Sequence, residues 1–118
     1  TKAFFWNSCR WKAYWKNIRI SPKKLRVVAE IIRNKDAAWA LNFLKFAPKK
    51  WAEILYKVLH SAVSNAVNNN SQDPKGLYID SLSITKGIVY KRGQPVSRWR
   101  MHSILKRTSN VRLELQVK

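Results

Sequence analysis

The last eight residues of the chain alternate between apolar and polar side chains without a break. One side is apolar and the other polar: Val111, Leu113, Leu115 and Val117 against Arg112, Glu114, Gln116 and Lys118. A period of two residues predicts a β-strand with one buried face, here over residues 111–118. A second strand is predicted over residues 77–85, where Leu82 and Ile84 alternate with small polar residues. A third is predicted over residues 11–20, which are rich in aromatic and β-branched side chains.

Three other segments carry apolar residues at helical spacing, and each has a start signal. The first starts at Ser21-Pro22, where the serine hydroxyl can cap free amides and proline loses no hydrogen bond, and should end near Asn34. The second follows Asp36, a candidate N-cap. The third is predicted from Pro48 to about Val67, followed by a loop over residues 68–76, which is rich in Asn, Ser and Pro.

Tryptophan residues account for much of the aromatic content. We expect Trp39 and Trp51 to pack in the core beside the helices. Trp6, Trp11 and Trp15 precede or lie in the first strand, where they could stack on nucleic-acid bases or cover the hydrophobic core. Core packing is slightly favoured for these three side chains.

The connection between the last two strands, about residues 86–110, is too long for an ordinary loop. It is not a bland linker, because apolar residues recur through it and Gly93 and Pro95 permit a bend. If the flanking strands continue into it, it is a long antiparallel hairpin with its tip near Gly93 to Pro95. Arms of roughly 10 residues, at about 3.3 Å each, reach about 30 Å. A compact body of this size has a radius of gyration of only about 13 Å, so the hairpin would protrude.

The charge is strongly positive and unevenly placed. The 24 Lys and Arg residues against 6 Asp and Glu give a net charge of +18. The length of 118 residues suits a single domain over 1–118. Residues 86–107 hold seven basic side chains and no acidic one, and residues 1–35 hold ten basic side chains and one acidic one. A small body with this charge repels itself unless a polyanion neutralises it, so nucleic acid is the expected partner.

Composition argues against several other classes of protein. The single cysteine, Cys9, allows no internal disulfide and no multi-cysteine metal site, and with no evident base it reads as an inert small residue. The sequence has no paired carboxylates, metal-ligand cluster or phosphate-cradling glycine loop, so we expect no enzyme, cofactor or metal. It lacks an uncharged apolar stretch of about 20 residues, and we expect no membrane contact.

Three ordered groups of residues are similar to those of a known family. The first group is the helix-opening segment from Ile20 to Val28, with the sequence Ile-Ser-Pro-Lys-Lys-Leu-Arg-Val-Val. The second is Ala47-Pro48-Lys49-Lys50 followed by an apolar helix that ends Ser61-Ala62-Val63-Ser64-Asn65-Ala66. The third is Lys91-Arg92, then Arg98 and Arg100, then Ile104-Leu105-Lys106-Arg107-Thr108-Ser109-Asn110. Together they resemble the family of bacterial-type ribosomal protein twenty-two of the large subunit, from about Arg10 to the C-terminus.

The resemblance implies an α+β fold, with three helices packed on a small antiparallel three-stranded sheet and a long protruding β-hairpin. It implies a structural constituent of the large ribosomal subunit, in a bacterial cytoplasm or in an organelle such as a plastid or mitochondrion. Members of the family bind large-subunit rRNA, support assembly and extend the hairpin along the peptide exit tunnel. The implied partners are that rRNA, ribosomal protein four near the tunnel constriction, other large-subunit proteins and the passing nascent chain.

The resemblance also places the hairpin cations. Lys91 and Arg92 would lie near the tip, Arg98 and Arg100 would line the returning arm, and Lys106 and Arg107 would anchor the base. Val96 stands where the family usually has a basic residue, and Trp99 stands where glycine is usual. The full set of candidate rRNA contacts is Lys12, Lys16, Arg19, Lys23, Lys24, Arg26, Lys86, Lys91, Arg92, Arg98, Trp99, Arg100, His102, Lys106 and Arg107.

Two alternatives remain from the residues themselves. The helices that follow Ser21 and Asp36 could form a helix-turn-helix variant of a DNA-binding regulator, although the densest charge lies in the long connection rather than on a recognition helix. An RNA-modifying enzyme is the other alternative, and it lacks a recognisable nucleophile and base.

Overall fold

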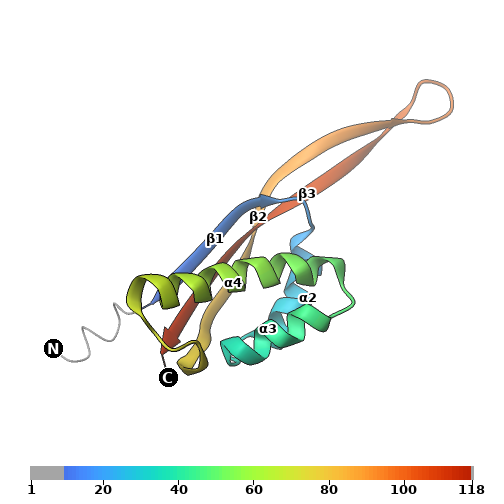
Figure 1. The fold of residues 1–118 in the computed structure, drawn as a ribbon. Coiled ribbons are helices and arrows are strands. Elements are labelled where there is room, and N and C mark those ends of the chain that lie inside the picture. The colour runs from blue at the N-terminus through green and yellow to red at the C-terminus, as the bar shows by residue number, and fades with distance from the viewer. Residues whose placement is uncertain (1–9, 118) are drawn as a thin grey trace.

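The computed structural model describes residues 10–117. The predictions made for Trp6, Cys9 and Lys118 lie outside the described residues. Figure 1 shows a body of three helices against a sheet, from which two long strands extend well past the rest of the chain. The elements in chain order are β1 (Trp11–Ile18), α2 (Pro22–Ile32), α3 (Ala37–Phe46), α4 (Lys50–Asn70), a short 3-10 helix (Pro74–Gly76), β2 (Leu77–Pro95) and β3 (Met101–Val117).

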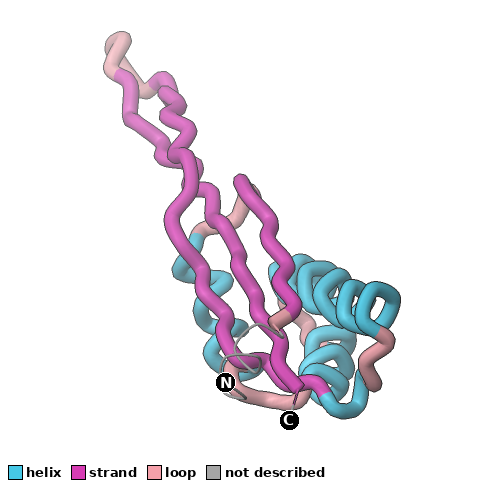
Figure 2. Tube along the Cα trace, turned by 90° about the vertical axis from the view of Figure 1, so that its left-hand side faces the viewer, coloured by secondary structure: helices cyan, strands magenta, loops and turns pink. Residues whose placement is uncertain are grey.

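The sheet is antiparallel and has the strand order β1-β3-β2. The last strand in the chain therefore lies in the middle, where both of its edges are paired (Figure 2). The alternation read from the sequence is confirmed, because Val111, Leu113 and Leu115 are fully buried. The α+β class, with three helices on a three-stranded antiparallel sheet, is likewise confirmed.

One hydrophobic core joins the sheet to the helices. Each helix contributes the residues that its spacing predicts, such as Leu25 and Ile32 of α2, Leu44 of α3, and Leu55 and Leu59 of α4. Proline at the first position of α2 is in place, while the Ser21 hydroxyl makes no capping hydrogen bond.

A β-bulge keeps β2 in phase with this core. Ile79 pairs with Leu115 and Ser81 pairs with Glu114, so Asp80 is an extra residue without a partner in the ladder. An extra residue exchanges the two faces of a strand. Leu77 and Ile79 before the bulge, and Leu82 and Ile84 after it, therefore all point into the core.

The predicted hairpin exists, and its turn lies later than expected. The last pair of the ladder is Pro95 with Met101, and the Val96 amide donates to the Arg100 carbonyl at 2.8 Å. Gly93 stays in the strand, where a Cβ would lie 2.3 Å from the Met101 Cε atom. The Met101 side chain is flexible and exposed and could move aside, so glycine is not required there, and the residue makes no bend. The chain reverses over residues 96–100.

The hairpin makes the molecule long and narrow. Its principal extents are 68 × 33 × 22 Å and its radius of gyration is 17.8 Å, against about 13 Å for a compact chain of this length. Seven residues of each arm pair beyond the Lys86–Ser109 pair, from Val89 to Pro95 on β2. At about 3.3 Å per residue they span about 23 Å, somewhat less than the expected 30 Å.

Two other predictions are corrected, the end of α4 and the burial of Trp39. α4 continues to Asn70, past the expected end at Val67, and Ser71 ends it in the left-handed conformation with φ of 51°. The Ser71 amide reaches the Val67 carbonyl, so the asparagine residues complete the last turn instead of opening a loop. Trp39, expected in the core, is 46% exposed and stacks on Phe43, because α3 turns that face away from the sheet. Trp51 is partly buried against the core.

Shortening the hairpin should leave the stability of the body unchanged. No residue from 85 to 107 is buried, so the distal arms bury little apolar surface. Replacing residues 92–104 with an Asn-Gly turn, which suits a two-residue hairpin, should shift the thermal midpoint of the free protein by less than about 3 °C. Thermal unfolding followed by circular dichroism measures this. A fall of about 10 °C would mean that the arms support the core.

Candidate nucleic-acid interface

The hairpin leaves the body at a second bulge, and its direction is set there. Lys86 pairs with Ser109 and Val89 pairs with Arg107, so Gly87 and Ile88 face Thr108 alone. A Cβ on residue 87 would lie 2.5 Å from the Thr108 Oγ1 atom and 3.3 Å from the Thr108 carbonyl carbon. The two strands therefore approach each other closely only because residue 87 is glycine.

Three polar side chains of β3 connect this root to neighbouring segments. The Thr108 hydroxyl donates to the Ile88 carbonyl at 2.5 Å, and the Ser109 hydroxyl donates to the Ile20 carbonyl at 2.8 Å. The Asn110 carboxamide oxygen accepts from the backbone amide of Asn17 at 3.1 Å. Thr108 and Ser109 are fully buried. The Thr108 bond links the two strands of the hairpin, while the Ser109 and Asn110 bonds join the root to the connection after β1 and to the end of β1, and so aim the hairpin.

Four cations gather around an aromatic ring just above the root. A cavity of about 220 Å³ is lined by Arg19, Tyr90, Arg92, Lys106, Arg107 and Thr108. The guanidinium carbons of Arg19 and Arg92 lie 5.8 Å and 5.6 Å from the Tyr90 ring centroid. Both distances are within the range of a cation–π interaction. Tyr90 therefore positions two guanidinium groups. Arg92 donates one N–H to the Lys91 carbonyl at 2.9 Å, and its other donors can reach phosphate oxygens.

A larger basic cleft of about 470 Å³ lies beside the start of α2. It is lined by Ser21, Pro22, Lys23, Arg26, Lys86 and Arg107. Arg107 lines both this cleft and the cavity at Tyr90, so the two openings are neighbours. The positive end of the α2 dipole adds to the same field. We call these two openings together the root surface.

The other predicted rRNA-binding residues of the body either lie apart from the root surface or already contact other groups of the protein. Lys12 lies opposite Glu114 in the ladder, and the Lys16 ammonium lies 5.5 Å from the Tyr14 ring centroid. The Lys24 ammonium lies 5.9 Å from the Trp51 ring, on the helix layer. Arg26, within the root surface, also donates to the Ile84 carbonyl at 3.2 Å.

The distal hairpin carries the other predicted residues at corrected positions. Lys91 and Arg92 pair with Leu105 and Ile104, in the middle of the outgoing arm rather than near the tip. Arg98 and Arg100 belong to the turn itself instead of the returning arm. The turn passes through left-handed conformations at Arg98 and Trp99, with φ of 58° and 51°, and the Trp99 side chain is 98% exposed. His102 begins the returning arm opposite Gln94.

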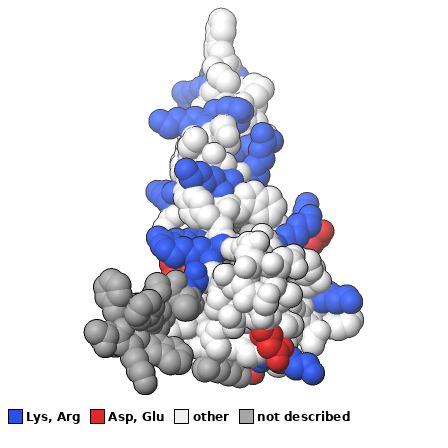
Figure 3. Space-filling model, turned by 60° about the vertical axis from the view of Figure 1, so that its left-hand side comes forward, with Lys and Arg blue, Asp and Glu red and all other residues white. Residues whose placement is uncertain are grey.

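Basic side chains follow the stalk over most of its length (Figure 3). In that view no acidic residue lies on the hairpin, and the carboxylates are confined to the body. The acid-free segment read from the sequence is thus a continuous cationic projection, which starts at the root surface and ends at the turn.

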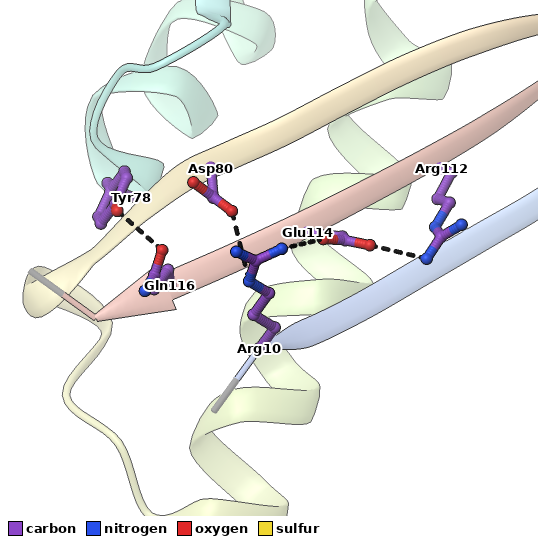
Figure 4. Close-up of polar contacts among 6 residues, drawn as sticks. All are labelled: Arg10, Tyr78, Asp80, Arg112, Glu114 and Gln116. Atoms are coloured by element: carbon purple, nitrogen blue, oxygen red, sulfur yellow. Dashed lines mark hydrogen bonds and ion pairs between the residues drawn. The ribbon is translucent and has the colours of Figure 1, made fainter. Parts of the chain in front are cut away.

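A network of arginines and carboxylates, which the sequence did not predict, lies on the sheet away from the hairpin. Glu114, 7% exposed, receives the Arg112 guanidinium at 2.8 Å and that of Arg10 at 3.3 Å. Arg10 also reaches Asp80 at 3.5 Å, from the first bulge (Figure 4). These arginines are engaged with carboxylates of the sheet, so we do not count them as part of the candidate interface.

Two further residues have roles that the sequence alone did not predict. Tyr90 lies directly before Lys91-Arg92, and that position is a usable signal for cation–π packing. The Arg33 guanidinium donates to the Leu82 carbonyl at 2.9 Å and holds α2 to β2. A helical arginine gives no sequence signal for that contact.

Two structural observations bear on other classes of function. Within residues 10–117, no group of three or more His, Cys, Asp and Glu side chains is placed to hold a metal ion. None of the described helices is both long enough and apolar enough to cross a membrane.

Comparison with known proteins gives a consistent result. The sequence model of the family described as ribosomal protein L22p/L17e matches residues 13–116. Proteins named large ribosomal subunit protein uL22 are similar over most of their length. The one from Metamycoplasma hominis is 47% identical over 97 residues, which are 82% of this chain and 75% of the relative. The one from Mesoplasma florum is 46% identical over 100 residues, 85% of this chain and 89% of the relative. The one from Maridesulfovibrio salexigens is 47% identical over 100 residues, which are 85% of this chain and 91% of the relative.

The fold, the cationic stalk and these matches define the class: a structural constituent of the large ribosomal subunit rather than an enzyme. Within that class, the chain belongs to the ribosomal protein L22p/L17e family. The family recognised from the three groups of residues is therefore confirmed.

Proposed function

We propose that the chain binds large-subunit rRNA through its root surface and hairpin, supports assembly of the subunit, and extends the hairpin along the peptide exit tunnel. The observation that carries this proposal is the hairpin itself. It projects from a body of ordinary size, has no acidic residue between positions 86 and 107, and buries no side chain from 85 to 107.

The proposed mechanism is electrostatic and geometric. Phosphate contacts fix position without reading sequence, and arginine and lysine supply them from all sides of a narrow ribbon. A two-stranded ribbon alone is marginally stable in water. Walls of folded RNA around it would neutralise the cations and hold the arms extended, while the Gly87 bulge sets the angle of entry.

Three groups of rRNA contacts follow from the geometry. The root surface supplies Arg19, Lys23, Arg26, Lys86, Arg92, Lys106 and Arg107. The arms and turn supply Lys91, Arg98, Trp99, Arg100 and His102. Lys12 and Lys16 on β1 form a weaker third group. Lys24 lies at Trp51, so its assignment to rRNA has the least support.

The turn is proposed to meet the other partners. Ribosomal protein four and the nascent chain are the partners that the family resemblance implies at the tunnel. The exposed side chains of Trp99 and Met101 give the tip an apolar end beyond the cationic arms. These apolar side chains can contact protein, beside the rRNA contacts proposed for Arg98 and Arg100 of the same turn.

Sedimentation tests the proposal directly. In a sucrose gradient of a lysate that contains the tagged chain, the protein should travel with the large subunit and leave it only in high salt. Competition between folded rRNA and duplex DNA tests the regulator alternative. A preference for the duplex would support a helix-turn-helix and overturn the rRNA proposal.

The role of Tyr90 can be tested separately. Tyr90→Leu removes the ring that Arg19 and Arg92 both contact and should weaken rRNA binding about fivefold, because two exposed cation–π contacts of about 0.5 kcal/mol each are lost. Tyr90→Phe keeps the ring and should bind like the unmodified chain. Filter binding at fixed salt measures both. Equal losses for the two variants would point to the hydroxyl instead of the ring.

A further inference from the structure

An apolar groove lies on the outer side of the helix layer, between α2 and α3. It has a volume of about 550 Å³ and is lined by ten residues. Its most exposed members are Phe46 at 78%, Val27 at 59%, Trp39 at 46% and Ile31 at 45%. Single exposed apolar residues are ordinary, but a contiguous group around one hollow marks an interaction surface.

The fold does not require these side chains to be apolar. The core-facing residues of the same helices, such as Leu25, Ile32 and Leu44, are already buried on the opposite side. The exposed groove residues Val27, Ile31 and Trp39 lie on another stripe of these helices, while Val28 and Phe43 connect the groove to the core. Trp39 and Phe43 stack with ring centroids 5.3 Å apart and nearly parallel planes, which gives the groove a rigid aromatic wall.

Cations lie at the border of the groove, and one of them, Lys49, belongs to its lining. The Lys45 ammonium lies 5.9 Å from the centroid of the Phe46 ring, which lines the groove. At the neighbouring edge, the ammonium groups of Lys49 and Lys24 lie 5.6 Å and 5.9 Å from the Trp51 ring. Among the ten lining residues, only Asn42 is polar without charge and only Lys49 is charged.

This arrangement fits a protein segment better than RNA. A sugar–phosphate backbone needs several cations where it lies, as the root surface supplies them, and only one of the ten groove residues, Lys49, is charged. An apolar floor between two helices, with basic groups at its rim, suits an amphipathic segment that carries apolar anchors and acidic flanking residues.

We propose that this groove is a docking site for an acidic-flanked, apolar segment of a neighbouring protein of the large subunit. Apolar anchors fill the hollow between Ile31, Trp39 and Phe46, and carboxylates meet the ammonium groups of Lys45 and Lys49. The proposal rests on membership of the subunit, which the family match establishes, and not on the rRNA contacts proposed for the hairpin.

Site-directed photo-cross-linking inside intact subunits tests the proposal. A photoreactive phenylalanine analogue is placed at position 46, where the side chain is exposed and the core is untouched. Large subunits that have incorporated the chain are purified and irradiated, and the linked fragment is sequenced. We expect a peptide of another subunit protein with apolar residues and at least two Asp or Glu close by. The same analogue at the exposed His60 position on α4 should not give that peptide.

Peptide binding to the free chain tests whether the groove requires acidic flanking residues. The probes are two synthetic peptides with the same leucine anchors, one flanked by glutamate and the other by lysine. The glutamate peptide should shift the NMR signals of Val27, Ile31 and Trp39, and Lys45→Glu with Lys49→Glu should weaken its binding about fivefold.

Several outcomes would overturn the proposal. In the subunit, these are a cross-link from position 46 to an rRNA nucleotide or to a second copy of the chain, a linked peptide without acidic residues, or no cross-link. With the peptides, equal binding of both probes or no shift in the groove has the same effect. Loss of rRNA binding in hairpin variants leaves these measurements unaffected, so the two proposals fail separately.

Discussion

Replacing Arg98, Arg100, Lys106 and Arg107 together with alanine is expected to weaken rRNA binding by about 100-fold at 0.1 M salt and to flatten its salt dependence. Each neutralised phosphate contributes about 0.7–0.9 to the slope of log K against log salt, so four lost contacts should lower it by about 3. The four side chains occupy the turn and the root. Binding isotherms from about 0.05 to 0.5 M salt measure both quantities.

A matched variant separates local contact from overall charge. Lys35, Lys50, Lys57 and Lys75 are exposed and lie outside the hairpin, and their replacement removes the same four charges. We expect that control to change the slope by less than about 1. If both variants flattened the slope equally, binding would follow net charge, and the hairpin would have no particular part in it.

Two double variants separate the contribution of the root to rRNA affinity from that of the turn. Removal of Lys106 and Arg107 affects the root surface, where Arg107 lines both openings, whereas removal of Arg98 and Arg100 affects only the turn. Because the root is joined to the body by Ser109 and Asn110, its contacts require no ordering of a long arm. The root pair should therefore cost more affinity than the turn pair.

The elements of the fold were largely readable because local patterns and the core agree. The alternation from Val111 to Val117 needs one buried face, and the helices supply it. The hairpin was inferred from length and charge rather than from alternation, since a ribbon that is exposed on both faces leaves no period in its sequence. The bulge of β2 at Asp80 leaves no signal of its own in the sequence and emerges only from pairing, whereas a glycine within a strand, as at Gly87, is compatible with a bulge without locating one.

The errors have physical causes as well. Gly93 and Pro95 predict a turn, yet Gly93 pairs with Ser103 within the arms, and Pro95 occupies the end of an arm where its missing N–H is tolerated. Tryptophan is usually buried, so its residue type predicts a core position for Trp39, but the residue lies on a face of α3 that lines the groove. The root surface could be predicted only as a set of basic residues. Its geometry depends on Arg19 and Tyr90 meeting across elements, which no spacing encodes.

The root also explains how a thin projection can be placed accurately. Gly87 lets two backbones approach, Thr108 closes that approach, and Ser109 and Asn110 join it to the segment before α2. The cations of the root surface are carried on these same residues or on their neighbours. A change in strand separation at the bulge should therefore disturb both folding and the direction of the arms.

Gly87→Ala is the sharpest test of that coupling. The new Cβ would lie 2.5 Å from the Thr108 Oγ1 atom, which is fully buried, so the strands must separate. Overpacking of this kind costs about 1–3 kcal/mol, which lowers the thermal midpoint by about 5–10 °C in a chain of this size. Affinity for rRNA should fall as well, because Arg107 and Lys86 shift with the bulge. Scanning calorimetry and filter binding measure the two effects.

Gly76→Ala is the matched control, because a Cβ at that position meets no atom within 4 Å. It should leave both the midpoint and the affinity nearly unchanged. Thr108→Ala in the Gly87→Ala background removes the closest contact, so the double variant should be less destabilised than the sum of the single changes. The 3.3 Å approach to the Thr108 carbonyl carbon remains, so recovery should be partial. Strict additivity would show that Gly87 and Thr108 act independently, and the hairpin would then need another explanation for its fixed direction.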